Sequence, residues 1–151
     1  PPVVVGYINY GEVDMWGTDA SLTYFINREW TLDLTYSHLG LTEFYNPITK
    51  NKDPINAPRN KAGFKLQYNP RRWPITGSLN ARYVGGFNWS SGIYYGAIDP
   101  YIIYDFHAGY EINKYAKINL TVNNLFNHFH TEIIGGPSLG RIVLFRLQTK
   151  F

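Results

Sequence analysis

Two histidines near the end of the chain have the spacing best suited to ligand chemistry. His128 and His130 flank a single residue, so on an extended strand both side chains would lie on the same face. Two imidazoles on one face can bind a transition metal or supply an axial ligand to haem. Glu132 is the one acidic residue close to them in the sequence. The simpler interpretation, an exposed polar pair where a loop begins, needs no ligand.

A third histidine is predicted to share the polar face of a strand with two carboxylates. His107 has Asp105 and Glu111 at even spacing, which permits a catalytic or metal-binding group but also fits a solvated surface. The sequence has no Ser-His-Asp spacing, no glycine-rich phosphate loop and no cysteine. We therefore predict no catalytic residue, no metal site and no cofactor, and the protein is not expected to be an enzyme.

An aromatic segment between two predicted strands offers a second kind of site. Trp89, Tyr94 and Tyr95 lie in a polar stretch that contains a glycine. Aromatic side chains in a loop suit stacking on a glycan or a macrocyclic ligand. They equally suit a girdle that settles the loop against lipid head groups, and the sequence leaves both interpretations open.

The charges of the chain are scattered. The net charge is +3, and Lys50, Lys52, Arg59 and Lys61 form the main basic group, around one predicted loop. This group could attract anionic ligands or lipopolysaccharide phosphates, or simply be solvated. Without a dense basic patch, we predict no nucleic-acid partner.

Apolar and polar residues alternate along most of the chain, which indicates β-strands with one wet and one apolar face. The clearest case begins at Trp30, where every second residue up to Tyr36 is apolar. The alternation predicts eight strands, over residues 3–10, 14–26, 30–37, 60–69, 75–87, 101–111, 116–125 and from 141 to the end.

The connections between these strands alternate in length. Short turns are expected near residues 27–29, 69–74 and 112–116, and long loops over 40–58, 88–100 and 126–140. Outer-membrane β-barrels have short turns on the periplasmic side and long loops outside. No apolar run is long enough for a transmembrane helix. We therefore predict an all-β fold, a transmembrane antiparallel up-and-down β-barrel with about eight strands present.

A soluble β-sandwich is the competing architecture, since it also has alternating strands. Three features favour the barrel: strands of ten residues or more, Tyr and Trp at strand ends, and opposite faces that are uniformly polar. The last strand adds a fourth feature. Val143, Phe145 and Leu147 form its apolar face, and the sequence closes on Phe151, as outer-membrane barrels do.

Four motifs make the chain resemble the carboxy-terminal part of TonB-dependent outer-membrane receptors. The first runs from Asn9 to Ala20, with Asp19 where the family has Glu. The second is Asn56-Ala-Pro-Arg59, and the third is Val122-Asn-Asn-Leu-Phe-Asn127. The fourth is the Gly140-Arg141 pair that leads into a final strand ending in Phe.

This resemblance implies a location and a function. Residues 1–151 would be the carboxy-terminal segment of a 22-stranded barrel domain, without its plug, in the outer membrane of a Gram-negative bacterium. Such receptors take up a scarce nutrient, most often a ferric siderophore, with energy delivered through TonB. The implied partners are outer-membrane lipid and lipopolysaccharide, the rest of the barrel, the plug, TonB and the small-molecule ligand.

The resemblance also implies roles for particular residues. The barrel-insertion machinery would recognise Val143, Phe145, Leu147 and Phe151 as an assembly signal, and loss of Phe151 should impair assembly more than ligand affinity. The candidate ligand-binding residues are Trp89, Tyr94, Tyr95, His128 and His130. The ligand itself cannot be named from this segment. The alternative is a free-standing eight-stranded outer-membrane barrel with an adhesive, structural or enzymatic role.

Overall fold

The computed structural model describes residues 12–150, and all regular secondary structure there is β-strand. This confirms the predicted all-β fold. The strand predicted over residues 3–10 and the terminal Phe151 lie outside the described residues. The described strands are β1 (Gly17–Phe25), β2 (Trp30–Leu39), β3 (Glu43–Asn46), β4 (Asn51–Pro54), β5 (Asn60–Tyr68), β6 (Ile75–Val84), β7 (Phe87–Ser91), β8 (Tyr94–Ile98), β9 (Tyr101–Asn113), β10 (Ala116–Asn123) and β11 (Ile142–Thr149).

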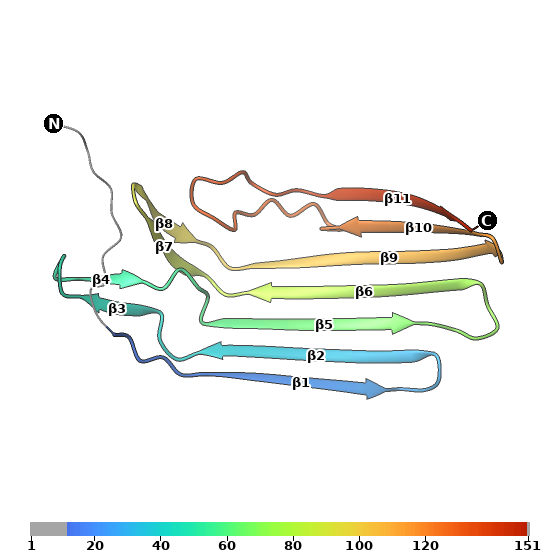
Figure 1. Cartoon of the computed structure of the whole chain (residues 1–151), viewed down its shortest axis with the longest axis horizontal. Coiled ribbons are helices and arrows are strands. Elements are labelled where there is room, and N and C mark those ends of the chain that lie inside the picture. The colour runs from blue at the N-terminus through green and yellow to red at the C-terminus, as the bar shows by residue number, and fades with distance from the viewer. Residues whose placement is uncertain (1–11, 151) are drawn as a thin grey trace.

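Seven strands form one antiparallel sheet in the order β1-β2-β5-β6-β9-β10-β11 (Figure 1). Each strand pairs with the next long strand along the chain, which confirms the up-and-down arrangement. The edge strands β1 and β11 do not pair with each other, so within residues 12–150 the sheet is open.

The connections alternate in length as predicted, with short turns at one end of the sheet and long connections at the other (Figure 1). Asparagines close two of the short turns. The Asn27 side chain accepts hydrogen bonds from the backbone N–H groups of Glu29 and Trp30, and the Asn113 side chain accepts one from Tyr115. Such side-chain bonds stabilise tight turns by satisfying backbone donors.

Two of the predicted long loops prove to be partly regular, which corrects the prediction. The 40–58 connection contains the β3–β4 hairpin, and the 88–100 connection contains most of the β7–β8 hairpin. Their strands have only four or five residues, too few for alternation to stand out from a loop. The strand predicted over 75–87 ends at Val84, because Gly85 and Gly86 separate β6 from β7.

The strand register places most of the large apolar residues of the seven strands on one face. One row of directly opposed residues crosses the whole sheet: Tyr24, Leu32, Leu66, Leu79, Phe106, Val122 and Val143. The neighbouring row on the other face is polar over five strands: Thr23, Asp33, Lys65, Asn80 and Asp105. The sheet therefore has an apolar face and a polar face, as the alternation predicts.

The apolar face has no second layer packed on it. On the edge strands, Leu22 is 58% and Phe145 is 68% exposed, and large apolar side chains are also exposed on the inner strands. A β-sandwich would cover this face with a second sheet, whereas the only other sheets in residues 12–150 are the two small hairpins. Residues 12–150 therefore do not form a sandwich.

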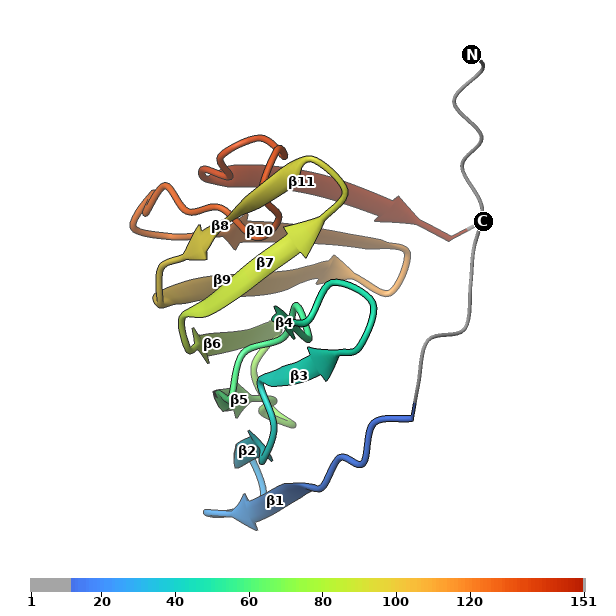
Figure 2. The same cartoon turned by 90° about the vertical axis from the view of Figure 1, so that its left-hand side faces the viewer.

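A small hydrophobic cluster lies instead at the end of the sheet that carries the long connections. Ile98, Tyr101 and Ile103 are buried together, and Phe87 and Trp89 pack against them. Tyr101 and Ile103 alternate with the apolar-face residues of β9, so the cluster lies on the polar face. Figure 2 views the molecule from this end, with the two hairpins toward the viewer.

Within the described residues, no helix is long and apolar enough to cross a membrane.

Candidate ligand-binding site at the loop end

The third long connection leaves β10 through an asparagine in a left-handed backbone conformation. Asn124 has φ of 56° and is only 4% exposed. Its side chain accepts a hydrogen bond from the backbone N–H of His128 and donates one to the His128 carbonyl, both at 2.8 Å. Asn adopts positive φ more readily than most residues. Asn124 thus folds the chain back sharply immediately after the strand.

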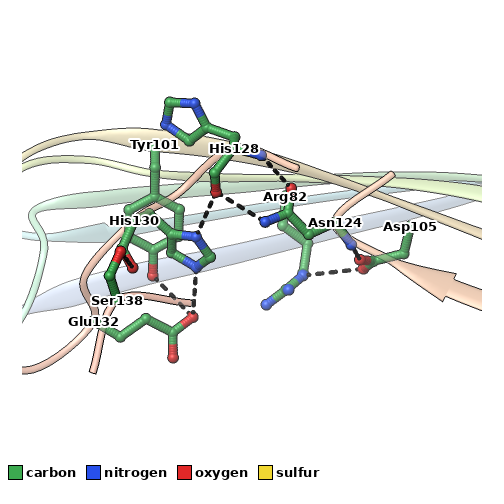
Figure 3. Close-up of polar contacts among 8 residues, drawn as sticks. All are labelled: Arg82, Tyr101, Asp105, Asn124, His128, His130, Glu132 and Ser138. Carbon is green, nitrogen blue, oxygen red and sulfur yellow. Dashed lines mark hydrogen bonds and ion pairs between the residues drawn. The ribbon is translucent and has the colours of Figure 1, made fainter. Parts of the chain in front are cut away.

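The backbone of Asn124 is also tied to the polar face of the sheet. Its N–H donates to Oδ1 of Asp105 at 3.0 Å (Figure 3). The other oxygen of Asp105 lies 3.1 Å from Nδ2 of Asn80 and 3.5 Å from Nε of Arg82. The Asp105 carboxylate therefore joins β6, β9 and the third long connection at one point.

Folding back at Asn124 brings His130 over the first residue of β9. The rings of His130 and Tyr101 lie 4.4 Å apart between centroids. Nδ1 of His130 lies 3.1 Å from the His128 carbonyl oxygen, and Nε2 lies 3.3 Å from Oε1 of Glu132. Figure 3 shows these contacts, together with the Tyr101 hydroxyl that donates to the same Glu132 oxygen. Each ring nitrogen of His130 thus faces an oxygen acceptor, and a neutral imidazole can donate its one N–H to either of them.

A cavity of about 370 Å³ lies between this folded segment and the β8–β9 junction. We call it the loop pocket. His128, Phe129 and His130 line one side, and Asp99 and Tyr101 line the other. The side chain of His130 is only 6% exposed, whereas His128 is exposed and its ring makes no hydrogen bond within residues 12–150. His128 is therefore the imidazole of this pair that remains available to a ligand.

The β7–β8 hairpin packs against the same connection. Gly135 has φ of 86°, and a methyl group at this position would lie 2.6 Å from the Tyr94 ring. A methyl group on Gly96 would similarly lie 3.1 Å from Ile134. These close approaches show that the hairpin and the third connection form one packed unit.

The predicted ligand-binding residues thus occupy different environments. The structure brings His128 and His130 together at the loop pocket, and Tyr94 lies against Gly135 beside it. Trp89 is half-buried and packs against the hydrophobic cluster. Tyr95 is 71% exposed and does not line the pocket.

The residues with catalytic spacing on the polar face are held by neighbours in the sheet. His107 bonds to Thr121 through Nδ1, and Glu111 forms an ion pair with Lys117. Asp105 is held by the contacts described above. In the part of the chain that the structure describes, no three His, Cys, Asp or Glu side chains form a group that could hold a metal ion.

The sequence analysis did not identify Tyr101 or Asn124 as residues that build the site. It also did not predict that Asp105 would bind the backbone of Asn124. Tyr101 carried a usable signal, because it is an aromatic residue at a position that alternates with the apolar face of its strand. Asn124 lies within a motif that was noted only for its resemblance. The Asp105 contact joins residues 19 positions apart and has no local signal.

The comparisons with known proteins decide the family. Residues 1–125 match the family model described as TonB dependent receptor-like, beta-barrel. The chain belongs to the TonB-dependent receptor β-barrel family. Members of this family are outer-membrane proteins of Gram-negative bacteria. The match confirms the resemblance to this family. It covers the first two motifs and most of the third, and it ends before the Gly140-Arg141 pair and β11. A search of curated proteins gives no match.

Solved structures of this receptor family have the same fold over most of the chain. The copper transporter OprC superposes with a TM-score of 0.72 at 16% identity, over 91% of this chain and 24% of its own. The closed form of the ferric-catecholate import receptor Fiu from E. coli K12 gives 0.70 at 20% identity, over 91% and 21%. A mutant of the ferric enterobactin receptor PfeA from Pseudomonas aeruginosa gives 0.69 at 15% identity, over 91% and 22%. The chain therefore spans between a fifth and a quarter of the length of these structures.

Proposed function

We propose that this chain is the carboxy-terminal barrel segment of a receptor that takes up a nutrient across the outer membrane with energy from TonB. Residues 1–151 would supply part of the barrel wall, three outside loops and the closing strand. The remaining strands, the plug and the TonB-binding motif would come from other parts of the complete protein. Support comes from the family match and from superposition on about a fifth of much longer receptors.

The observation that carries this proposal is the apolar row that crosses all seven strands without a covering layer. In water, such a face would be buried against another layer, because exposed apolar area is unfavourable. In a bilayer, the same face is solvated by lipid chains, and the polar face lines the interior of the barrel. The open edges of β1 and β11 must then be paired in the membrane, since unpaired strand edges are not tolerated in lipid.

The alternating connections give the segment an orientation in the membrane. Barrels of this kind place short turns in the periplasm and long loops outside, so the loop pocket would open at the outer mouth. The hydrophobic cluster holds the β7–β8 hairpin and the third connection over the polar face, which would place them beside the interior of the barrel. A ligand entering from outside would meet His128, Tyr94 and Tyr95 first, while His130 and Trp89 would support them.

The ligand class is proposed from the relatives. By their names, PfeA is a receptor for ferric enterobactin and Fiu imports ferric catecholates, while OprC transports copper. A ferric siderophore is therefore the first ligand to test. The exposed aromatic rings beside the loop pocket suit stacking on its planar groups.

The test is uptake by a strain that lacks this protein. Cells with and without the complete protein would be given ⁵⁵Fe bound to a panel of catecholate, hydroxamate and carboxylate siderophores, and radioactive copper complexes in a parallel assay. We expect one siderophore to be accumulated only when the protein and TonB are both present. Uptake that continues without TonB, or no difference for any iron or copper complex, would contradict the proposal and favour the free-standing barrel.

A further inference from the structure

An asparagine in the first long connection is hydrogen-bonded to the β7–β8 hairpin. The Asn56 side chain accepts a hydrogen bond from the backbone N–H of Ser90 and donates one to the Ser90 carbonyl, both at 2.8 Å. These two bonds satisfy the same backbone groups that a neighbouring strand would satisfy. Ser90 lies within β7, so Asn56 acts as a one-residue substitute for a strand partner along the edge of the hairpin.

The backbone of Asn56 is shaped for this contact. Its φ is 61°, in the left-handed region that most residues avoid but Asn tolerates. The residue is half-buried and lies in the motif Asn56-Ala-Pro-Arg59, immediately before β5. The contact spans 34 residues of sequence and is the hydrogen-bonded link between the first and second long connections in the described part of the chain.

From Ser90, packing continues to the loop pocket. Trp89, the preceding residue, packs on the hydrophobic cluster that contains Tyr101. The Tyr101 ring in turn lies 4.4 Å from the ring of His130, which lines the pocket. A shift of β7 would therefore move the support beneath Tyr101 and His130.

We propose that Asn56 is a positioning residue for the loop pocket, acting through Ser90, β7 and the hydrophobic cluster without lining the pocket itself. The part of this proposal that concerns ligand binding rests on the proposed function. It makes the first long connection part of the binding apparatus, although no residue of that connection lines the loop pocket.

The test measures the pocket directly and needs no known ligand. Diethyl pyrocarbonate modifies exposed histidine rings, and His130 is shielded while His128 is exposed. In the complete protein in outer-membrane vesicles, Asn56→Gly keeps the left-handed backbone accessible but removes both bonds to Ser90. We expect its His130 to react several-fold faster, with His128 unchanged. Asn56→Asp keeps one acceptor for the Ser90 N–H and should give an intermediate rate.

Asn51→Ala is the matched control, because Asn51 lies in the same connection and its side chain makes no hydrogen bond within residues 12–150. It should leave His130 shielded. Hydrogen exchange of the β7 amides shows whether the Ser90 contact was lost, and resistance to unfolding in detergent shows whether the barrel assembled. Faster exchange in β7 with unchanged His130 reactivity would overturn the proposal.

Measuring siderophore uptake by the same variants separates this inference from the proposed function. If ⁵⁵Fe-siderophore uptake requires the protein and TonB, Asn56→Gly should weaken the affinity of the protein for that siderophore by up to about tenfold, because losing the two bonds to Ser90 lowers the population of the positioned pocket. Unchanged affinity would overturn the role in binding. If neither a siderophore nor a copper complex is taken up, the proposed function fails, while the His130 measurement still decides whether Asn56 positions the pocket.

Discussion

Three asparagines hold the long connections in left-handed backbone conformations. Asn56, Asn124 and Asn127 all have φ near 60°, and each uses its side-chain amide to bind a distant or returning backbone segment. Asn127 accepts a bond from the N–H of Arg141, which brings the third connection back to β11. Their positions could be taken from the motifs of the sequence. Their partners could not, because spacing along the chain carries no signal for a contact across 14 or 34 residues.

The Asn124 turn gives a prediction at this scale. Asn124→Ala removes both bonds to the His128 backbone and places a residue that disfavours positive φ at 56°. We expect the opening free energy of residues 126–140 to fall by about 1–3 kcal/mol, the usual cost of leaving buried polar groups unpaired. Hydrogen exchange of the loop amides measures this. Asn123→Ala is the control, since Asn123 has regular strand geometry and its side chain makes no hydrogen bond within the described residues. Equal effects of the two substitutions would show that the turn does not depend on the bonds between Asn124 and the His128 backbone.

At the scale of elements, strand length decided what the sequence could predict. The seven strands of eight or more residues are long enough to be recognised as strands, and the prediction for each falls on the observed strand to within a few residues. The β3–β4 and β7–β8 hairpins were missed because four or five residues beside prolines and glycines resemble a loop. The packing of the β7–β8 hairpin onto the third connection depends on tertiary contacts such as Tyr94 against Gly135.

That packing gives a prediction with an internal control. Gly135→Ala should loosen the β7–β8 hairpin from the third connection, because the new methyl group would overlap the Tyr94 ring and the backbone has positive φ. Gly92→Ala has the same backbone cost, about 1–2 kcal/mol, but its methyl group meets no atom within 4 Å. Diethyl pyrocarbonate labelling should therefore expose His130 in Gly135→Ala and leave it shielded in Gly92→Ala. Equal labelling would mean that the Tyr94 contact does not hold the loop pocket together.

Across the whole molecule, the sheet has almost no interior of its own. Within the described residues, only four hydrophobic side chains are buried, and three of them belong to the cluster at the loop end. The apolar face must therefore be covered by something outside the chain, and a bilayer is the solvent that suits it. Alternation predicted this two-faced character. It could not predict how the loop end is closed, because that depends on side chains from three separate connections.

Placing a charged residue on each face of the sheet in turn tests whether the apolar face is covered by a bilayer. Leu79→Lys places an ammonium group in the apolar row, while Ser78→Lys places one beside it on the polar face. We expect Leu79→Lys to destabilise the assembled protein by about 2–4 kcal/mol if the position lies near the bilayer midplane. Ser78→Lys should have little effect. Urea unfolding in lipid vesicles measures both, and similar losses would argue against a lipid-facing apolar row.

The most direct test of the central claim follows alternate residues of β5 through the membrane. These 151 residues contain no cysteine. In the complete protein, with any cysteine elsewhere replaced, single cysteines at residues 64, 65, 66 and 67 can be introduced and labelled with an environment-sensitive fluorophore. If the apolar face meets lipid, labels replacing Phe64 and Leu66 will emit at short wavelengths and be quenched by lipid-soluble quenchers. Labels replacing Lys65 and Gln67 will respond to water-soluble quenchers instead. The absence of this two-residue alternation would contradict the account.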